Sequence, residues 1–196
     1  MKEKLSKSSV ALIVILAVFG LATVIHGIML AVTSFVLPLF IIHILEMACF
    51  VWAIYYAFSS HAKSSTFFRA MIITMILIMA VQASLDPALF YFSHSYSLIL
   101  LSFLAVVGLT VIYCKWQDYP LCKKWAWVVI LSTFAIAIIM TLLPLDIPAE
   151  TPEEASEMLP EAALSALAEV YTRPLLAACV LGCYMARMSQ KAKEEK

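Results

Sequence analysis

The chain of 196 residues has a formal net charge of zero, is 64% hydrophobic and is only 13% charged. Ordinary globular domains are roughly 45–50% apolar and about 25% charged, and a water-soluble fold of this length could not bury so much apolar surface. The composition therefore argues against a soluble domain and predicts a protein whose solvent is the lipid bilayer.

A helix that crosses a bilayer needs about 20 predominantly apolar residues. Six segments meet this requirement. In chain order they are residues 9–31, 35–58, 66–85, 88–113, 125–145 and 162–188. We therefore expect an all-α fold, a polytopic integral membrane protein built as a single six-helix transmembrane domain over residues 1–196.

The breaks between these spans carry polar residues and prolines, which interrupt or begin helices. The breaks are Thr33, Ser34 and Pro38 after the first span, then "SSHAKSS" with His61, then "LDPALF" with Pro87, then "KWQDYPLCKK". Each break is short, so consecutive spans are expected to run antiparallel to one another.

The basic residues are segregated to one side of this arrangement. Every lysine and arginine except Arg173 precedes the first span, follows the last one or lies in a connection on that same side. They are Lys2, Lys4, Lys7, Lys63, Arg69, Lys115, Lys123, Lys124, Arg187, Lys191, Lys193 and Lys196. Cytoplasmic loops are enriched in Lys and Arg, so both termini are expected in the cytoplasm. If the source is bacterial, the expected location is the inner membrane.

The long connection on the opposite side, an acidic outer loop over residues 146–161, carries only negative charge. Its charged residues are Asp146, Glu150, Glu153, Glu154, Glu157 and Glu161. Thr151, Pro152 and Glu154 fit the first positions of a short helix ending near Leu159. The loop is either a solvated linker or a lip that attracts cations or docks a partner.

Ionisable residues inside a membrane are costly and usually face the interior of a helix bundle. The stretch "IIHILEMACF" places His43 and Glu46 three residues apart, on one face of the second span. Glu169 and Arg173 are four apart on the sixth span. At a rise of about 1.5 Å per residue, Glu46 falls near the midplane and the others in the outer half.

The candidate site is completed by His26 on the first span, Gln82 on the third and His94 on the fourth, which are expected at similar depth. Arg173 is the sole basic residue inside a span, with Glu169 and Glu46 as candidate partners. Pro174 follows it and cannot donate a backbone hydrogen bond, so a kink is expected there.

Two interpretations of these residues stay open. In one, they line an outward-opening polar cavity that binds or transports a small solute or protons, with Arg173 holding an anionic group while Glu46 and His43 titrate. In the other, they form a structural network inside a non-catalytic membrane subunit or assembly factor. The possible partners are then a small solute in the first case, and a membrane protein or further copies of the chain in the second.

A third option is haem or a metal bound through His26, His43 and His94. No H-E-x-x-H motif or recurring spacing supports it, so we expect no cofactor, no metal and no catalytic residue. The sequence contains no G-x-S-x-G, P-loop or dinucleotide fingerprint, which disfavours an enzyme. Its basic residues follow the topology rule instead of forming a patch, so nucleic-acid binding is not expected.

Overall fold

The chain folds into a bundle in which helices that follow one another along the chain run antiparallel. The computed structural model describes residues 6–33, 37–58, 65–85, 96–142 and 152–194, and all regular structure within them is helical. The helices are α1 (Lys7–Thr33), α2 (Leu37–Phe58), α3 (Ser65–Leu85), α5 (Tyr96–Cys114), α6 (Tyr119–Thr141) and α7 (Pro152–Glu194). The predicted all-α fold is therefore confirmed, with six helices in the described part of the chain.

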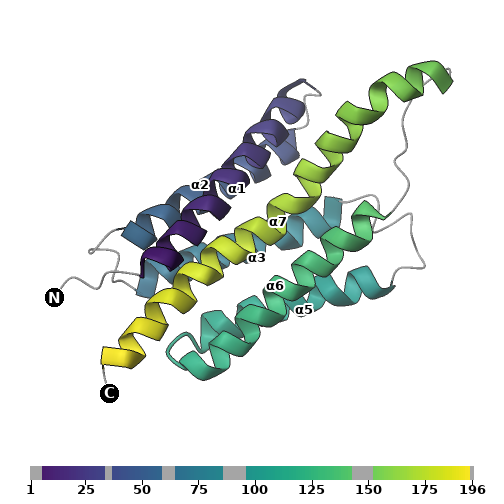
Figure 1. Ribbon diagram of the computed structural model, residues 1–196. Coiled ribbons are helices and arrows are strands. Elements are labelled where there is room, and N and C mark those ends of the chain that lie inside the picture. Colours follow the sequence, from purple (N-terminus) through teal and green to yellow (C-terminus); the bar gives the residue numbers. More distant parts are fainter. Residues whose placement is uncertain (1–5, 34–36, 59–64, 86–95, 143–151, 195–196) are drawn as a thin grey trace.

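Helix α7 lies at the centre of the bundle. Figure 1 shows it running diagonally between the pair α1 and α2 on one side and the pair α5 and α6 on the other. It contacts α1, α2, α3 and α6, while α5 packs against α6 and α3. Large buried side chains fill the spaces between these helices, among them Phe50, Met71, Leu109 and Leu176.

Four helical segments are long and apolar enough to cross a membrane. They are Lys7–Thr33, Leu37–Tyr56, Tyr119–Thr141 and Ala166–Ser189. The helices α3 and α5 contain shorter apolar segments, Thr66–Val81 and Leu98–Cys114. By length and composition the chain is a multi-pass membrane protein, and its many exposed Leu, Ile, Val and Phe side chains contact lipid.

The sixth predicted span differs from the helix observed. We expected a short helix ending near Leu159 and a separate span beginning at residue 162, but α7 is continuous through both Pro160 and Pro174. The sequence around Pro160 is rich in Glu, Ala, Leu and Met, which are strong helix formers. Their propensity outweighs the one backbone hydrogen bond that each proline removes.

The fifth helix begins earlier than the expected residue 125. Asp118 caps α6, because its side chain accepts a hydrogen bond of 3.2 Å from the backbone N–H of Leu121, and Pro120 occupies the first turn. Lys123 and Lys124 are thus exposed residues of the first helical turns instead of loop residues. For the fourth span, residues 88–95 lie outside the described part of the chain.

Aromatic side chains fasten one end of the bundle. The start of α1, the end of α2, the start of α3, the turn between α5 and α6 and the end of α7 all lie there (Figure 1). The Tyr184 hydroxyl donates to the carbonyl oxygen of Trp116 at 2.8 Å, and its ring stacks on Phe68. The guanidinium of Arg187 lies 4.1 Å from the ring centre of Tyr56, a cation–π contact that keeps a cation at this end.

Candidate functional site

Two glycines of α1 let α2 approach closely. A Cβ added to Gly27 would lie 2.7 Å from two ring atoms of His43, and one added to Gly20 would collide with the ring of Phe50. Gly27 comes seven residues after Gly20 in α1, whereas its partner His43 comes seven residues before Phe50 in α2. The two helices are therefore antiparallel, with His43 covering Gly27 and with Glu46 level with Val24.

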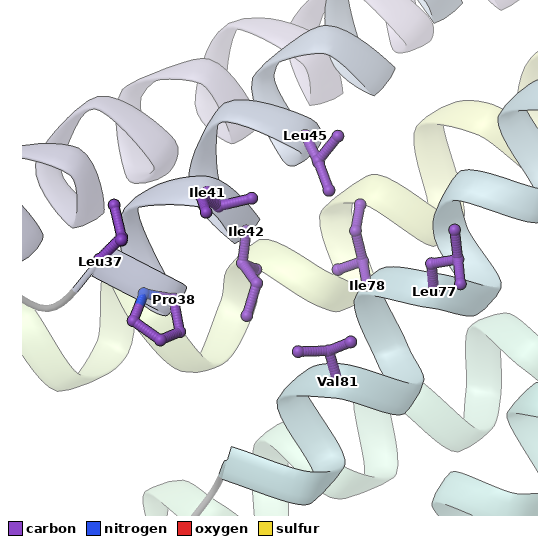
Figure 2. A pocket seen from close by; sticks show the side chains of 8 residues that line it. All are labelled: Leu37, Pro38, Ile41, Ile42, Leu45, Leu77, Ile78 and Val81. Carbon is purple, nitrogen blue, oxygen red and sulfur yellow. The ribbon is translucent and has the colours of Figure 1, made fainter.

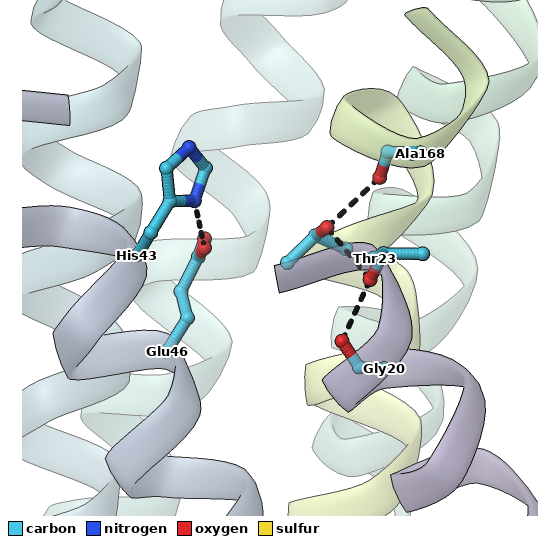
Figure 3. A network of polar contacts seen from close by, with 6 residues as sticks. Gly20, Thr23, His43, Glu46 and Ala168 are labelled. Carbon is cyan, nitrogen blue, oxygen red and sulfur yellow. Dashed lines mark hydrogen bonds and ion pairs between the residues drawn. The ribbon is translucent and has the colours of Figure 1, made fainter. Parts of the chain in front are cut away.

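His43 and Glu46 form a hydrogen-bonded pair inside the bundle. Nδ1 of His43 lies 2.8 Å from Oε2 of Glu46 (Figure 3). Glu46 is 0% exposed and His43 is 5% exposed. With the carboxylate ionised, the imidazole N–H donates; the same contact allows the two groups to share one proton. The structure thus brings together the two residues that the sequence places on one face of the second span.

A chain of hydroxyl groups joins α1 to α7. The hydroxyl of Thr172 on α7 lies 3.0 Å from Oγ1 of Thr23 on α1, and the Thr23 hydroxyl donates to the carbonyl oxygen of Gly20 at 2.7 Å. Figure 3 draws this chain and the His43–Glu46 pair in one view, with the Ala168 carbonyl oxygen as a further acceptor for Thr172. These contacts fix the relative heights of α1 and α7.

The register places Arg173 at the height of Glu46. The contacts of α1 give a first estimate: Glu46 is level with Val24, and Thr23, next to Val24, bonds to Thr172. Glu46 is therefore at about the height of Thr172 on α7. A second contact joins α2 to α7 directly, because Sγ of Cys183 donates to the carbonyl oxygen of Ala53 at 3.4 Å. These helices run parallel, so that contact sets Glu46 level with a residue seven before Cys183, which is Leu176.

Along α7, Arg173 lies between Thr172 and Leu176, the two positions that these contacts set level with Glu46. The difference in height is therefore less than one helical turn, about 5.4 Å. Arg173 is partly buried, and the helices α2 and α7 are in contact. A long, flexible guanidinium side chain can cover such a distance, so the packing allows Arg173 to reach the buried carboxylate.

The other predicted site residues that the structure describes are less buried than His43 and Glu46. Glu169 is exposed on α7, and His26 is partly buried on α1. Nε2 of His26 is itself buried and has no hydrogen-bond partner among the described residues. Gln82 belongs to α3, but its side chain is not among those described, and His94 and His61 lie outside the described residues. The prediction that seven residues share one site is therefore untested as a whole.

The haem or metal option also stays untested, because His94 is outside the described residues. Within the described helices, no group of three or more His, Cys, Asp or Glu side chains lies together. The ring of His43 is closed in by Glu46 and by the backbone of Gly27.

Thr23, Thr172 and the two contact glycines were not predicted as part of this region. The spacing of Gly20 and Gly27 was the one available signal, since a seven-residue repeat marks one face of a helix that packs against a neighbour. The sequence contains no such signal for the threonines. A hydroxyl in a membrane helix usually donates to a backbone carbonyl oxygen of the same helix, as Thr110 does to Val106.

Comparison with protein-family models, with curated proteins and with solved structures finds no match to this chain.

Proposed function

We propose that this chain is a membrane protein that binds or transports a small solute or protons, with the His43–Glu46 pair as the proton-binding element. The observation that carries the proposal is the position of Glu46, which is completely buried in the middle of an apolar helix and hydrogen-bonded to an imidazole. Ionisable groups at such positions mark proton relays and solute pathways, and histidine changes its charge near neutral pH.

In this proposal the three central residues have different roles. Glu46 binds the proton, and His43 orients the carboxylate and shares that proton across the contact of 2.8 Å. Arg173 neutralises Glu46 in the resting state and exchanges it for an anionic group of the solute, as the register of α2 and α7 permits. Glu169, exposed one turn before Arg173 on α7, is a second carboxylate that a solute from the outer side would pass before it reaches Arg173.

The proposed orientation has six spans, with both termini in the cytoplasm. The ends of the helices that carry basic residues lie at one end of the bundle (Figure 1), and cytoplasmic ends are enriched in Lys and Arg. In a bacterium this corresponds to the inner membrane. The acidic segment 146–161 then faces the outer side.

A second candidate function is a non-catalytic membrane subunit or assembly factor, in which the same residues only hold the helices together. The tight fit of His43 on Gly27 and the hydrogen bond from Thr172 to Thr23 favour it. Interhelical hydrogen bonds and small residues are the usual means of packing helices in membranes.

Infrared spectroscopy of the full chain in liposomes distinguishes the two functions. A proton-binding Glu46 gains a carbonyl band of a neutral carboxylic acid as the pH is lowered, and the band is absent in Glu46→Gln. Glu157→Gln, in the acidic segment, is the control and should leave the band unchanged.

The structural function makes the opposite prediction. A carboxylate that serves only in packing keeps one protonation state over the pH range in which the protein stays folded. The difference between the wild-type and Glu46→Gln spectra would then be the same at every pH, and that result would reject the proton-binding role.

A further inference from the structure

An apolar groove separates α2 from α3 in the half of the bundle away from the basic residues. Its volume is about 290 Å³, and eight aliphatic residues line it. Leu37, Pro38, Ile41, Ile42 and Leu45 come from α2, and Leu77, Ile78 and Val81 come from α3. Figure 2 shows the two sets of side chains on opposite sides of the gap.

The groove exists because the two helices are held together at their other ends. Trp52 and Tyr56 of α2 pack against Phe67 of α3, with ring centres 5.7 and 6.2 Å apart. The antiparallel register of the Tyr56–Phe67 contact sets Leu45 opposite Ile78 and Ile42 opposite Val81. Aliphatic side chains are shorter than the aromatic rings, so they leave space open where the rings would have filled it.

The groove has a buried floor and an exposed rim. Ile78 at the floor is only 1% exposed, whereas Leu77 at the rim is 53% exposed. Among the side chains that the structure describes, no charged or hydrogen-bonding one lines it. It therefore opens to the apolar surroundings of the bundle and offers its occupant only dispersion contacts and shape.

The size of the groove decides which occupant fits. A partner helix lying along Leu37–Leu45 would be about 12 Å long and 10–12 Å wide, which is roughly 900–1,400 Å³. An extended alkyl chain of that length, at a carbon contact diameter of about 4 Å, fills roughly 150 Å³. The groove of about 290 Å³ can therefore enclose one alkyl chain, whereas a helix could only lie across its mouth and insert side chains.

We propose that this groove binds one acyl chain of a membrane phospholipid, from the leaflet at the end of the bundle opposite to the basic residues. The site recognises the chain and not the head group, since its lining is entirely aliphatic. Its floor includes Ile42 and Leu45, the neighbours of His43 and Glu46 on α2, so the bound chain lies against the helix that carries the buried pair.

The test uses the full chain in phosphatidylcholine liposomes that contain a phosphatidylcholine with a photoreactive diazirine on one acyl chain. After illumination, mass spectrometry locates the labelled residues. We expect labelling of residues 37–45 and 77–81 to be several-fold stronger than labelling of equally exposed residues such as Leu131. Leu77→Trp, which fills the groove from its exposed rim, should abolish the excess.

The matched control is Leu131→Trp on α6, where the side chain is 63% exposed and lies outside the groove. It should leave the excess labelling unchanged. Ile41→Phe serves as a second groove-filling variant if Leu77→Trp melts at a lower temperature than wild type. Even labelling of all exposed apolar residues, or an excess that survives both groove variants, would overturn the proposal.

Discussion

The imidazole of His43 occupies the space that any side chain at Gly27 would need, since an added Cβ would lie 2.7 Å from its ring. The same imidazole bonds to Glu46 at 2.8 Å. The buried pair is therefore held from two sides, by a hydrogen bond within α2 and by the backbone of α1. A change in the separation of these helices would alter the environment of the carboxylate.

Gly27→Ala should destabilise the protein. The new methyl group would collide with the ring of His43, and forcing extra atoms into a packed core costs about 1–3 kcal/mol. Thermal unfolding of the detergent-purified protein measures the effect. The matched control is Gly182→Ala on α7, where an added Cβ meets nothing within 4 Å. It should be neutral or stabilising, because alanine is the better helix former by up to about 1 kcal/mol.

Glu46→Gln and Arg173→Gln test whether these two side chains pair across the bundle. Removing one partner of a buried ion pair costs about 3–5 kcal/mol, because the other charge stays buried without compensation. We expect each single variant to melt at a lower temperature than wild type and the double variant to lose much less than the sum. Strictly additive losses would show that Arg173 does not neutralise Glu46.

Local relationships in this chain could be predicted from the sequence, and contacts between helices could not. His43 and Glu46 are three residues apart, so the helical period alone puts them on one face. The bond from Thr172 to Thr23 depends on which faces of α1 and α7 meet, and no local pattern contains that information. The groove beside Ile42 likewise depends on how far α2 and α3 separate.

The continuous helix α7 shows a second limit. We expected a short helix to end near Leu159, directly before Pro160, and proline does lack the N–H that a helix interior requires. That rule considers one residue, whereas the helix continues through the strong helix formers on both sides. The predicted start of α6 at residue 125 was wrong for a related reason. Asp118 and Pro120 are residues that begin helices, but they lie in a segment whose charges indicated a loop.

Thr172→Val should weaken the contact between α1 and α7. It removes the hydroxyl that lies 3.0 Å from Oγ1 of Thr23 while keeping the shape of the side chain. Interhelical hydrogen bonds in membranes contribute about 0.6 kcal/mol on average and up to about 1.7, so a loss in that range is expected on thermal unfolding. Thr110→Val is the control, since that exposed hydroxyl donates to the carbonyl oxygen of Val106 on its own helix. Equal losses in the two variants would contradict a specific role for the interhelical bond.

Cys114 provides a test of orientation. It is exposed at the end of α5, where the basic residues gather, whereas Cys49, Cys122, Cys179 and Cys183 are buried. A thiol must be accessible to react, so a membrane-impermeant maleimide should label one cysteine in the folded protein. If the basic end is cytoplasmic, sealed vesicles label only when their cytoplasmic face points outward, and Cys114→Ser abolishes the labelling. Labelling from the opposite face would reverse the proposed orientation and would place the acyl-chain groove in the cytoplasmic leaflet.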